Sequence, residues 1–212
     1  MIRAIIFDLD GTIGDTLPLC IAAFRKSIEP LAGRAVSDEE IVATFGPSEE
    51  GTIRALVPDH YEEGVERYLA HYRELHPMCG RPFDGIADIL DFARARGVRL
   101  AMVTGKGARS TDITLEAFGL RHAFEIVETG SPHGPRKAEG IRSVLDRFEI
   151  EAGEAVYVGD APSDIEASRK VGVAIVSAAW AGTADPEALR ALAPDELFTD
   201  VAGFRQYLER VC

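Results

Sequence analysis

Two carboxylates, Asp8 and Asp10, follow directly on a short apolar segment near the start of the chain. That segment, Ala4 to Phe7, has no charge and is typical of a strand buried on both faces, and Gly11 then allows a sharp turn. Acids two residues apart in an extended chain point the same way and repel unless a cation lies between them. Mg²⁺ suits such a pair because it combines one or two carboxylates with water and phosphate oxygens. An ordinary polar turn is the alternative.

Other polar residues follow further predicted strands or precede a predicted helix. They are Thr104, Gly105 and Lys106 after one strand, Gly159 and Asp160 after another, Asp164 four residues on, and Lys137 before a helix. In open α/β sheets, ligands bind beyond the carboxyl ends of the strands. We therefore expect four carboxylates, a hydroxyl and a lysine to converge on one edge of the sheet.

Each of these residues has an ordinary explanation when it is taken alone. Thr104 is compatible with a helix cap, since Ser and Thr are common there. Lys137 is compatible with a solvated surface lysine, and Asp164 with an acid that stabilises the first turn of a helix. Only their joint placement at strand ends favours a catalytic site.

Strands and helices alternate through the second part of the chain. The predicted strands are 4–7, 98–103, 124–127, 155–158 and 173–176, and the predicted helices between and after them are 85–96, 109–118, 138–148, 163–171, 186–192 and 203–210. Such alternation implies right-handed crossovers. The predicted fold class is α/β, with a Rossmann-like parallel sheet covered by helices on both faces.

Residues 16–76 contain no convincing strand and show helical spacing of apolar residues instead. Ser37 and Glu40 form a capping-box pattern that predicts the start of one of these helices. We therefore expect an inserted helical cap at residues 16–81 and a discontinuous α/β core made of residues 1–15 and 82–212.

The composition narrows the class of protein. A net charge of −12 disfavours nucleic-acid binding, which needs a basic face, and also disfavours an anionic membrane surface. Three scattered cysteines show neither a metal-binding pair nor a disulfide framework, and no uncharged run near the N-terminus is long enough for a signal peptide. We expect a cytoplasmic protein whose partner is a small molecule.

Four motifs occur in one order along the chain: Asp8-Leu-Asp10-Gly-Thr, Thr104 at a strand end, Lys137 before a helix, and Gly159-Asp160-Ala-Pro-Ser-Asp164. This set resembles the haloacid dehalogenase-like hydrolases, in their phosphatase branch. The helical insertion is similar to the cap of the subgroup that contains phosphoglycolate phosphatases and β-phosphoglucomutases. The sequence departs from the family pattern at Gly105, where many relatives have Asn, and at Ala138, where Pro is usual.

The resemblance implies a role for each matched residue. Asp8 would be the nucleophile and Asp10 the general acid and base, with Thr104 and Lys137 completing the catalytic set. Thr104, Gly105 and Lys137 would bind the phosphoryl oxygens. Mg²⁺ would be held by the side chain of Asp8, the main-chain carbonyl of Asp10 and Asp160. Asp164 would orient Lys137 or a metal-bound water.

The function that follows is Mg²⁺-dependent hydrolysis of a small phosphomonoester through an aspartyl-phosphate, with phosphoglycolate as one candidate substrate. A sugar-phosphate mutase of the β-phosphoglucomutase kind is the first alternative. A phosphate- or metal-binding regulatory module without turnover is the second. Arg25, Arg54, His71 and Arg73 in the helical region are candidate contacts for an anionic substrate, although each residue type is more often solvated.

Overall fold

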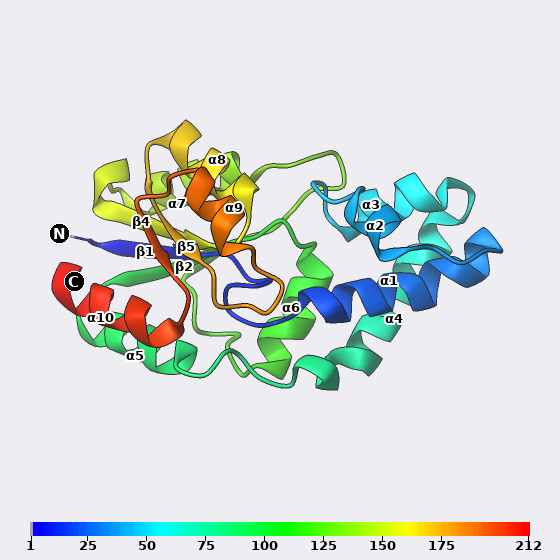
Figure 1. The fold of residues 1–212 in the computed structure, drawn as a ribbon, viewed down its shortest axis with the longest axis horizontal. Helices are drawn as coiled ribbons and strands as arrows, with labels where there is room; N and C mark the ends of the chain where they lie inside the picture. The colour runs from blue at the N-terminus through cyan, green and yellow to red at the C-terminus, as the bar shows by residue number, and fades with distance from the viewer. Residues whose placement is uncertain (1) are drawn as a thin grey trace.

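The computed structural model describes residues 2–212 and contains one six-stranded sheet (Figure 1). The strands are β1 (Ala4–Phe7), β2 (Arg99–Val103), β3 (Ile126–Glu128), β4 (Ala155–Gly159), β5 (Ala174–Ala178) and β6 (Glu196–Phe198). Their order is β3-β2-β1-β4-β5-β6, and each neighbouring pair is parallel. The predicted fold class is confirmed. Because β1 lies between β2 and β4, its carboxyl end is at the centre of the sheet.

Helices cover both faces of this sheet. The core helices are α5 (Ile86–Ala95), α6 (Ala108–Ala117), α7 (Lys137–Phe148), α8 (Pro162–Val171), α9 (Pro186–Ala191) and α10 (Val201–Val211). Apolar residues of α5 and α10 pack on the face that carries Ile5 and Phe7. Those of α7, α8 and α9 pack on the face that carries Ala4 and Ile6. Alternate residues of β1 therefore point into two separate cores, as a strand buried on both faces requires.

The remaining helices form a cap beyond the carboxyl ends of the strands (Figure 1). They are α1 (Leu17–Ala32), α2 (Asp38–Val42), α3 (Glu49–Leu56) and α4 (Tyr61–Leu75), with short 3₁₀ turns at Pro58–His60 and His76–Cys79. The cap has a third apolar cluster, in which Phe24, Tyr68 and Tyr72 are buried and to which α6 contributes Ile113. The predicted capping box at Ser37 and Glu40 is present at the start of α2. We propose residues 16–81 as the limits of the cap, which this third cluster supports.

Two strands near the edges of the sheet differ from the prediction. The β3 strand begins at Ile126 rather than at residue 124, and β6 was not predicted. Both have only three residues. The β3 strand was predicted with a different start, whereas β6 includes an exposed Glu196 and has too little apolar pattern to be recognised. No helix between residues 2 and 212 combines the length and apolar composition needed to cross a lipid bilayer.

Candidate active site

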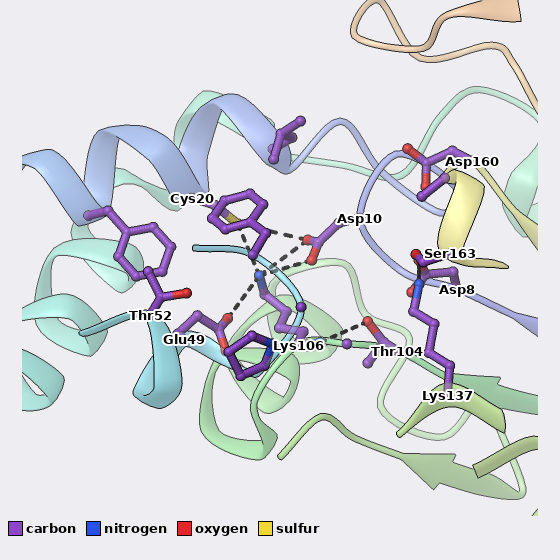
Figure 2. Close-up of a pocket in the computed structure, with 17 residues that line it drawn as sticks. Asp8, Asp10, Cys20, Glu49, Thr52, Thr104, Lys106, Lys137, Asp160 and Ser163 are labelled. Carbon is purple, nitrogen blue, oxygen red and sulfur yellow. Dashed lines mark hydrogen bonds and ion pairs between the residues drawn. The ribbon is translucent and has the colours of Figure 1, made fainter. Parts of the chain in front are cut away.

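A pocket of about 250 Å³ lies at the carboxyl ends of the strands, between the core and the cap (Figure 2). Its polar lining residues are Asp8, Asp10, Glu49, Thr52, Thr104, Lys106, Lys137, Asp160 and Ser163. Figure 2 shows Asp8, Lys137 and Asp160 at one end, with Asp10 in the middle and Thr52 at the other end. The structure thus brings together in one cavity the residues that the sequence placed at strand ends, while Asp164 lies directly behind.

Asp8 is held from two sides where β1 leaves the sheet. Its Oδ1 accepts a hydrogen bond from the Leu9 backbone N–H at 2.7 Å, and its Oδ2 lies 2.7 Å from Nζ of Lys137. The same ammonium lies 2.6 Å from Oδ1 of Asp164, which is fully buried and also accepts from the Tyr157 hydroxyl. Asp164 therefore fixes Lys137, and Lys137 fixes Asp8.

The carboxylates of Asp8, Asp160 and Asp164 form a cluster whose ligand atoms lie within 4.8 Å of one another. Asp164 already accepts from Lys137, Tyr157 and the Ala161 backbone N–H. Among residues 2–212, by contrast, the Asp160 carboxylate has no hydrogen-bond or ion-pair partner. Asp160 is therefore the carboxylate best placed to bind a hard cation, which takes oxygen ligands. Asp8, with one contact at each oxygen, is the second candidate ligand.

The charges at this end of the pocket favour such a cation. Burial raises the pKa of Asp8 to about 6, although the Lys137 ammonium opposes the effect. Burial, followed by repulsion from Asp164 and Asp8, raises the pKa of Asp160 well above its usual range. Burial works against the charge of Lys137, but Asp164 and Asp8 outweigh it and raise the pKa of that lysine. Three carboxylates thus lie around one ammonium, which pairs with Asp8 and Asp164, and a divalent cation would balance the excess negative charge.

Gly11 makes room for Asp160. It has φ +73°, a conformation that glycine adopts readily, and a Cβ built on it would lie 2.0 Å from Oδ2 of Asp160. The glycine of the first motif is therefore required both for the turn after β1 and for the position of a candidate metal ligand.

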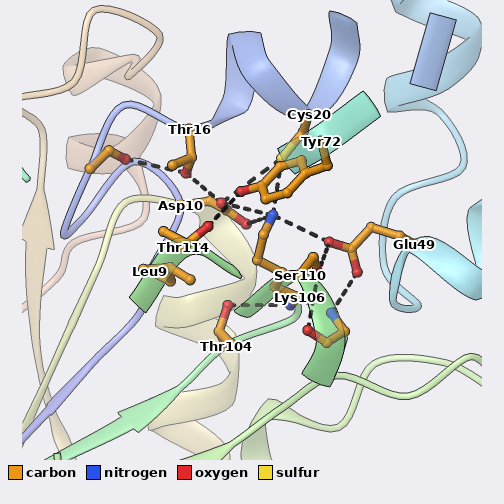
Figure 3. Close-up of polar contacts among 12 residues, drawn as sticks. Leu9, Asp10, Thr16, Cys20, Glu49, Tyr72, Thr104, Lys106, Ser110 and Thr114 are labelled. Atoms are coloured by element: carbon orange, nitrogen blue, oxygen red, sulfur yellow. Dashed lines mark hydrogen bonds and ion pairs between the residues drawn. The ribbon is translucent and has the colours of Figure 1, made fainter. Parts of the chain in front are cut away.

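Asp10 lies next to the nucleophile candidate but belongs to a different set of contacts (Figure 3). Its Oδ1 accepts from the hydroxyl of Thr16, at the start of α1. Both of its oxygens lie near Nζ of Lys106, at 3.2 and 3.3 Å. The Asp10 side chain stays 28% exposed, so it is open to the pocket. This position suits a group that exchanges protons with a substrate.

Thr104 and Gly105 continue β2 into the pocket. The buried Thr104 hydroxyl accepts from the Lys106 backbone N–H at 3.2 Å, and within the described part of the chain its own O–H donates to no other group, which leaves it available for an anion. Gly105 is not sterically required, because an added Cβ would meet only Cε of Lys137, at 3.7 Å. Gly130 packs against the same turn, where an added Cβ would lie 1.9 Å from the Gly105 carbonyl oxygen.

The sequence did not reveal two charged residues of the pocket. The sequence places Lys106 at a strand end but indicates no role for it, and no pattern singles out Glu49, the first residue of α3. The two side chains meet across the pocket, with Nζ of Lys106 3.2 Å from Oε1 of Glu49. No local sequence pattern predicts the ion pair between Lys106 and Glu49, because it depends on how the cap packs on the core.

The four candidate anion contacts of the helical region do not line the pocket. Arg25 forms ion pairs with Asp38 and Glu29, and Arg54 lies over the ring of Tyr61. His71 pairs with Glu74, and Arg73 is exposed to solvent. Of the two interpretations of these residues, the structure supports solvated side chains, because each one faces solvent or a neighbouring cap residue.

Comparison with known proteins agrees with the motif pattern. The family model described as haloacid dehalogenase-like hydrolase matches residues 5–178. A phosphoglycolate phosphatase of Rhodospirillum rubrum is 31% identical over 225 residues, covering 98% of this chain and 91% of the relative. The pyrophosphatase PpaX of Bacillus pumilus is 30% identical over 185 residues, covering 84% of each chain. A haloacid dehalogenase-like hydrolase of Streptococcus pneumoniae superposes with a TM-score of 0.78 at 25% identity, covering 98% of each chain.

Proposed function

The chain belongs to the haloacid dehalogenase-like hydrolases and is an enzyme of their phosphatase branch, and from that premise we propose that it hydrolyses a small phosphomonoester through an aspartyl-phosphate on Asp8. The observation that carries this proposal is the joint placement of Asp8, Asp10, Lys137 and Asp160 in one cavity. A strand-end nucleophile, a proton donor, a fixed ammonium and a free carboxylate are the parts that phosphoryl transfer needs.

In the first step, an oxygen of Asp8 attacks phosphorus and the bond from phosphorus to the leaving oxygen breaks. Asp10 gives its proton to that oxygen, so the leaving group departs as an alcohol rather than as an alkoxide. In the second step, Asp10 takes a proton from water as the water attacks the phosphorus of the aspartyl-phosphate. Phosphate then leaves, and both aspartates return to their starting states.

The fixed groups of the pocket stabilise the negative charge of the transferring phosphoryl group. Lys137 supplies a positive charge that its contacts with Asp8 and Asp164 hold in place. The Thr104 hydroxyl and the Gly105 N–H supply hydrogen-bond donors on the β2 side. Mg²⁺, held by Asp8, the Asp10 main-chain carbonyl and Asp160, would screen the repulsion between the nucleophile and the phosphate.

The sequence resemblance names phosphoglycolate as a candidate substrate, and one relative is a phosphoglycolate phosphatase by name. Another relative is named a pyrophosphatase, so the relatives differ in the leaving group. The pocket itself is lined on the cap side by Leu17, Phe24 and Phe45. A small organic leaving group fits these walls. We also propose a cytoplasmic location, which the free state of Cys20, Cys79 and Cys212 supports.

The test is the release of inorganic phosphate from a panel of small phosphomonoesters, including phosphoglycolate and hexose phosphates, with Mg²⁺ and with a chelator. We expect Mg²⁺-dependent release that Asp8→Asn abolishes. Conversion of one hexose phosphate into its isomer with little free phosphate would instead support the mutase. Binding of Mg²⁺ and phosphate without turnover of any ester would support the regulatory module.

A further inference from the structure

Glu49 ties the cap to the core at the edge of the pocket (Figure 3). Its Oε2 accepts from the Gly107 backbone N–H at 2.5 Å, and its Oε1 accepts from the Ser110 hydroxyl at 2.6 Å. Its side chain is only 10% exposed. A charged residue that is buried and held by several donors keeps one position. The Glu49 carboxylate is therefore a permanent part of the pocket wall.

All three N–H donors of the Lys106 ammonium are used in contacts within the protein. An ammonium has three N–H donors, and this one donates to Oδ1 and Oδ2 of Asp10, at 3.2 and 3.3 Å, and to Sγ of Cys20, at 3.1 Å. It also forms an ion pair with Oε1 of Glu49, at 3.2 Å. The ring of Tyr72 lies 4.6 Å from Nζ on a further side. The Lys106 side chain is 1% exposed, so no donor is left for a substrate.

In the part of the chain that the structure describes, the rest of the pocket lining provides no free positive charge that could pair with an anionic leaving group in place of Lys106. Among residues 2–212, the positively charged residues that line the cavity are Lys106 and Lys137. Lys137 lies at the phosphoryl end and is bound by Asp8 and Asp164. Beyond Asp10, toward the cap, the remaining lining residues are uncharged, and four of them are apolar: Leu17, Phe24, Phe45 and Pro47. Both carboxylates near the leaving group, Asp10 and Glu49, already share one ammonium.

We propose that Glu49 is a specificity-determining residue that neutralises Lys106 and thereby restricts the enzyme to phosphomonoesters with an uncharged leaving group. This inference rests on the proposed phosphatase function and names the substrate class for the same site. A leaving group with a carboxylate or a second phosphate would place its charge near Asp10 and Glu49 with no free cation to pair with it. Like charges brought together in a buried site are strongly disfavoured.

Two probes of nearly equal size test the charge by itself: 2-hydroxyethyl phosphate, whose leaving group is neutral, and phosphoglycolate, whose leaving group carries a carboxylate. With Mg²⁺ present, we expect kcat/KM to be higher for 2-hydroxyethyl phosphate by about tenfold or more. Glu49→Gln removes the charge but keeps the size of the side chain. This variant should shift the ratio of kcat/KM toward phosphoglycolate by about tenfold, mainly through KM, because one of the two negative charges beside Lys106 is then removed and Asp10 alone balances the ammonium.

Glu50→Gln is the matched control. Glu50 is the next residue of α3 and accepts from the Ser48 hydroxyl at 2.5 Å, but it has no contact with Lys106. The Glu50→Gln variant should leave the ratio of kcat/KM for the two probes unchanged. A wild-type preference for phosphoglycolate would overturn the proposed substrate class. An unchanged ratio in Glu49→Gln, or an equal shift in Glu50→Gln, would overturn the role of Glu49.

Affinity separates this inference from the phosphatase proposal itself. Calorimetric binding of both probes to Asp8→Asn with Mg²⁺ measures their discrimination without any turnover. We expect the same preference for 2-hydroxyethyl phosphate, and its reversal or absence would contradict the inference even if the enzyme is active. Failure of every ester to release phosphate would instead contradict the proposed function, whatever the affinities are.

Discussion

Nζ of Lys137 lies 2.7 Å from Oδ2 of Asp8, although 129 residues separate the two along the chain. The contact joins the start of α7 to the end of β1, at the point where the phosphoryl group would bind. In the proposed mechanism, a lysine in this position would both hold the nucleophile and present a positive charge to the phosphoryl oxygens. Because Asp164 holds the same ammonium from behind, the group is fixed before substrate binds.

Replacing Lys137 tests this double role. Lys137→Met should lower kcat/KM by about 10²–10³, because one fixed charge is lost from the transition state. It should also reduce the free energy of unfolding by about 3–5 kcal/mol, because buried carboxylates lose their partner. Steady-state rates and urea melts measure the two effects. Arg136→Met, at the adjacent cation, is the control and should change neither quantity greatly. Activity of Lys137→Met within a few fold of wild type would refute the role.

Asp10→Asn separates the two chemical steps. We expect turnover of alkyl phosphates to fall by about 10²–10⁴, because no proton reaches the leaving oxygen. With p-nitrophenyl phosphate, whose leaving group needs no proton, the first step should survive while hydrolysis of the aspartyl-phosphate stays slow. Rapid mixing should then show a burst of nitrophenol close to one equivalent per enzyme. Equal losses for both kinds of ester, with no burst, would argue against Asp10 as the general acid.

Gly11→Ala should weaken the binding of Mg²⁺ by about 10–100-fold, because the new Cβ displaces the Asp160 carboxylate. Gly97→Ala is a closely matched control. Gly97 also has φ +73°, but nothing lies within 4 Å of an added Cβ. Both variants should lose about 1–2 kcal/mol of stability to backbone strain. Metal titration followed by calorimetry should therefore separate them, and similar Mg²⁺ affinities in the two would contradict the metal role of Asp160.

The raised pKa of Asp8 gives a pH dependence of definite sign. Between its ordinary pKa of 3.8 and the raised pKa of about 6, the folded state binds more protons at this group than the unfolded state does. The metal-free protein therefore loses stability as pH rises through this window, by about 3 kcal/mol from Asp8. Bound Mg²⁺ would offset that loss by neutralising the carboxylate.

Thermal melts with Mg²⁺ and with a chelator, at about pH 5 and about pH 7.5, check this expectation. The rise in Tm caused by Mg²⁺ should be larger at the higher pH, because protons no longer compete with the metal. In Asp8→Asn the chelated protein should lose less stability over the same pH range. A rise in Tm that is the same at both pH values would speak against these carboxylates as the metal site.

The sequence predicted the sheet and the phosphoryl end of the site because both follow from local pattern. An uncharged run such as Ala4–Phe7 marks a buried strand, and the strand order brings residues at strand ends to one edge. The contacts on the cap side of the site could not be predicted from local pattern, because Glu49 and Lys106 meet only through the packing of the cap on the core. The short strand β6 was also not predicted, because three residues are too few to show the alternation of apolar and polar residues that marks a strand.

The most direct test of the account is to trap the covalent intermediate. The enzyme is mixed with Mg²⁺ and a turned-over phosphomonoester, quenched, reduced with borohydride to convert an acyl phosphate into an alcohol, and mapped by peptide mass spectrometry. We predict reduction at position 8, dependent on substrate and Mg²⁺ and absent from Asp8→Asn. Steady release of phosphate with no modification at position 8, or with modification of another carboxylate, would contradict the assignment of Asp8 as the nucleophile.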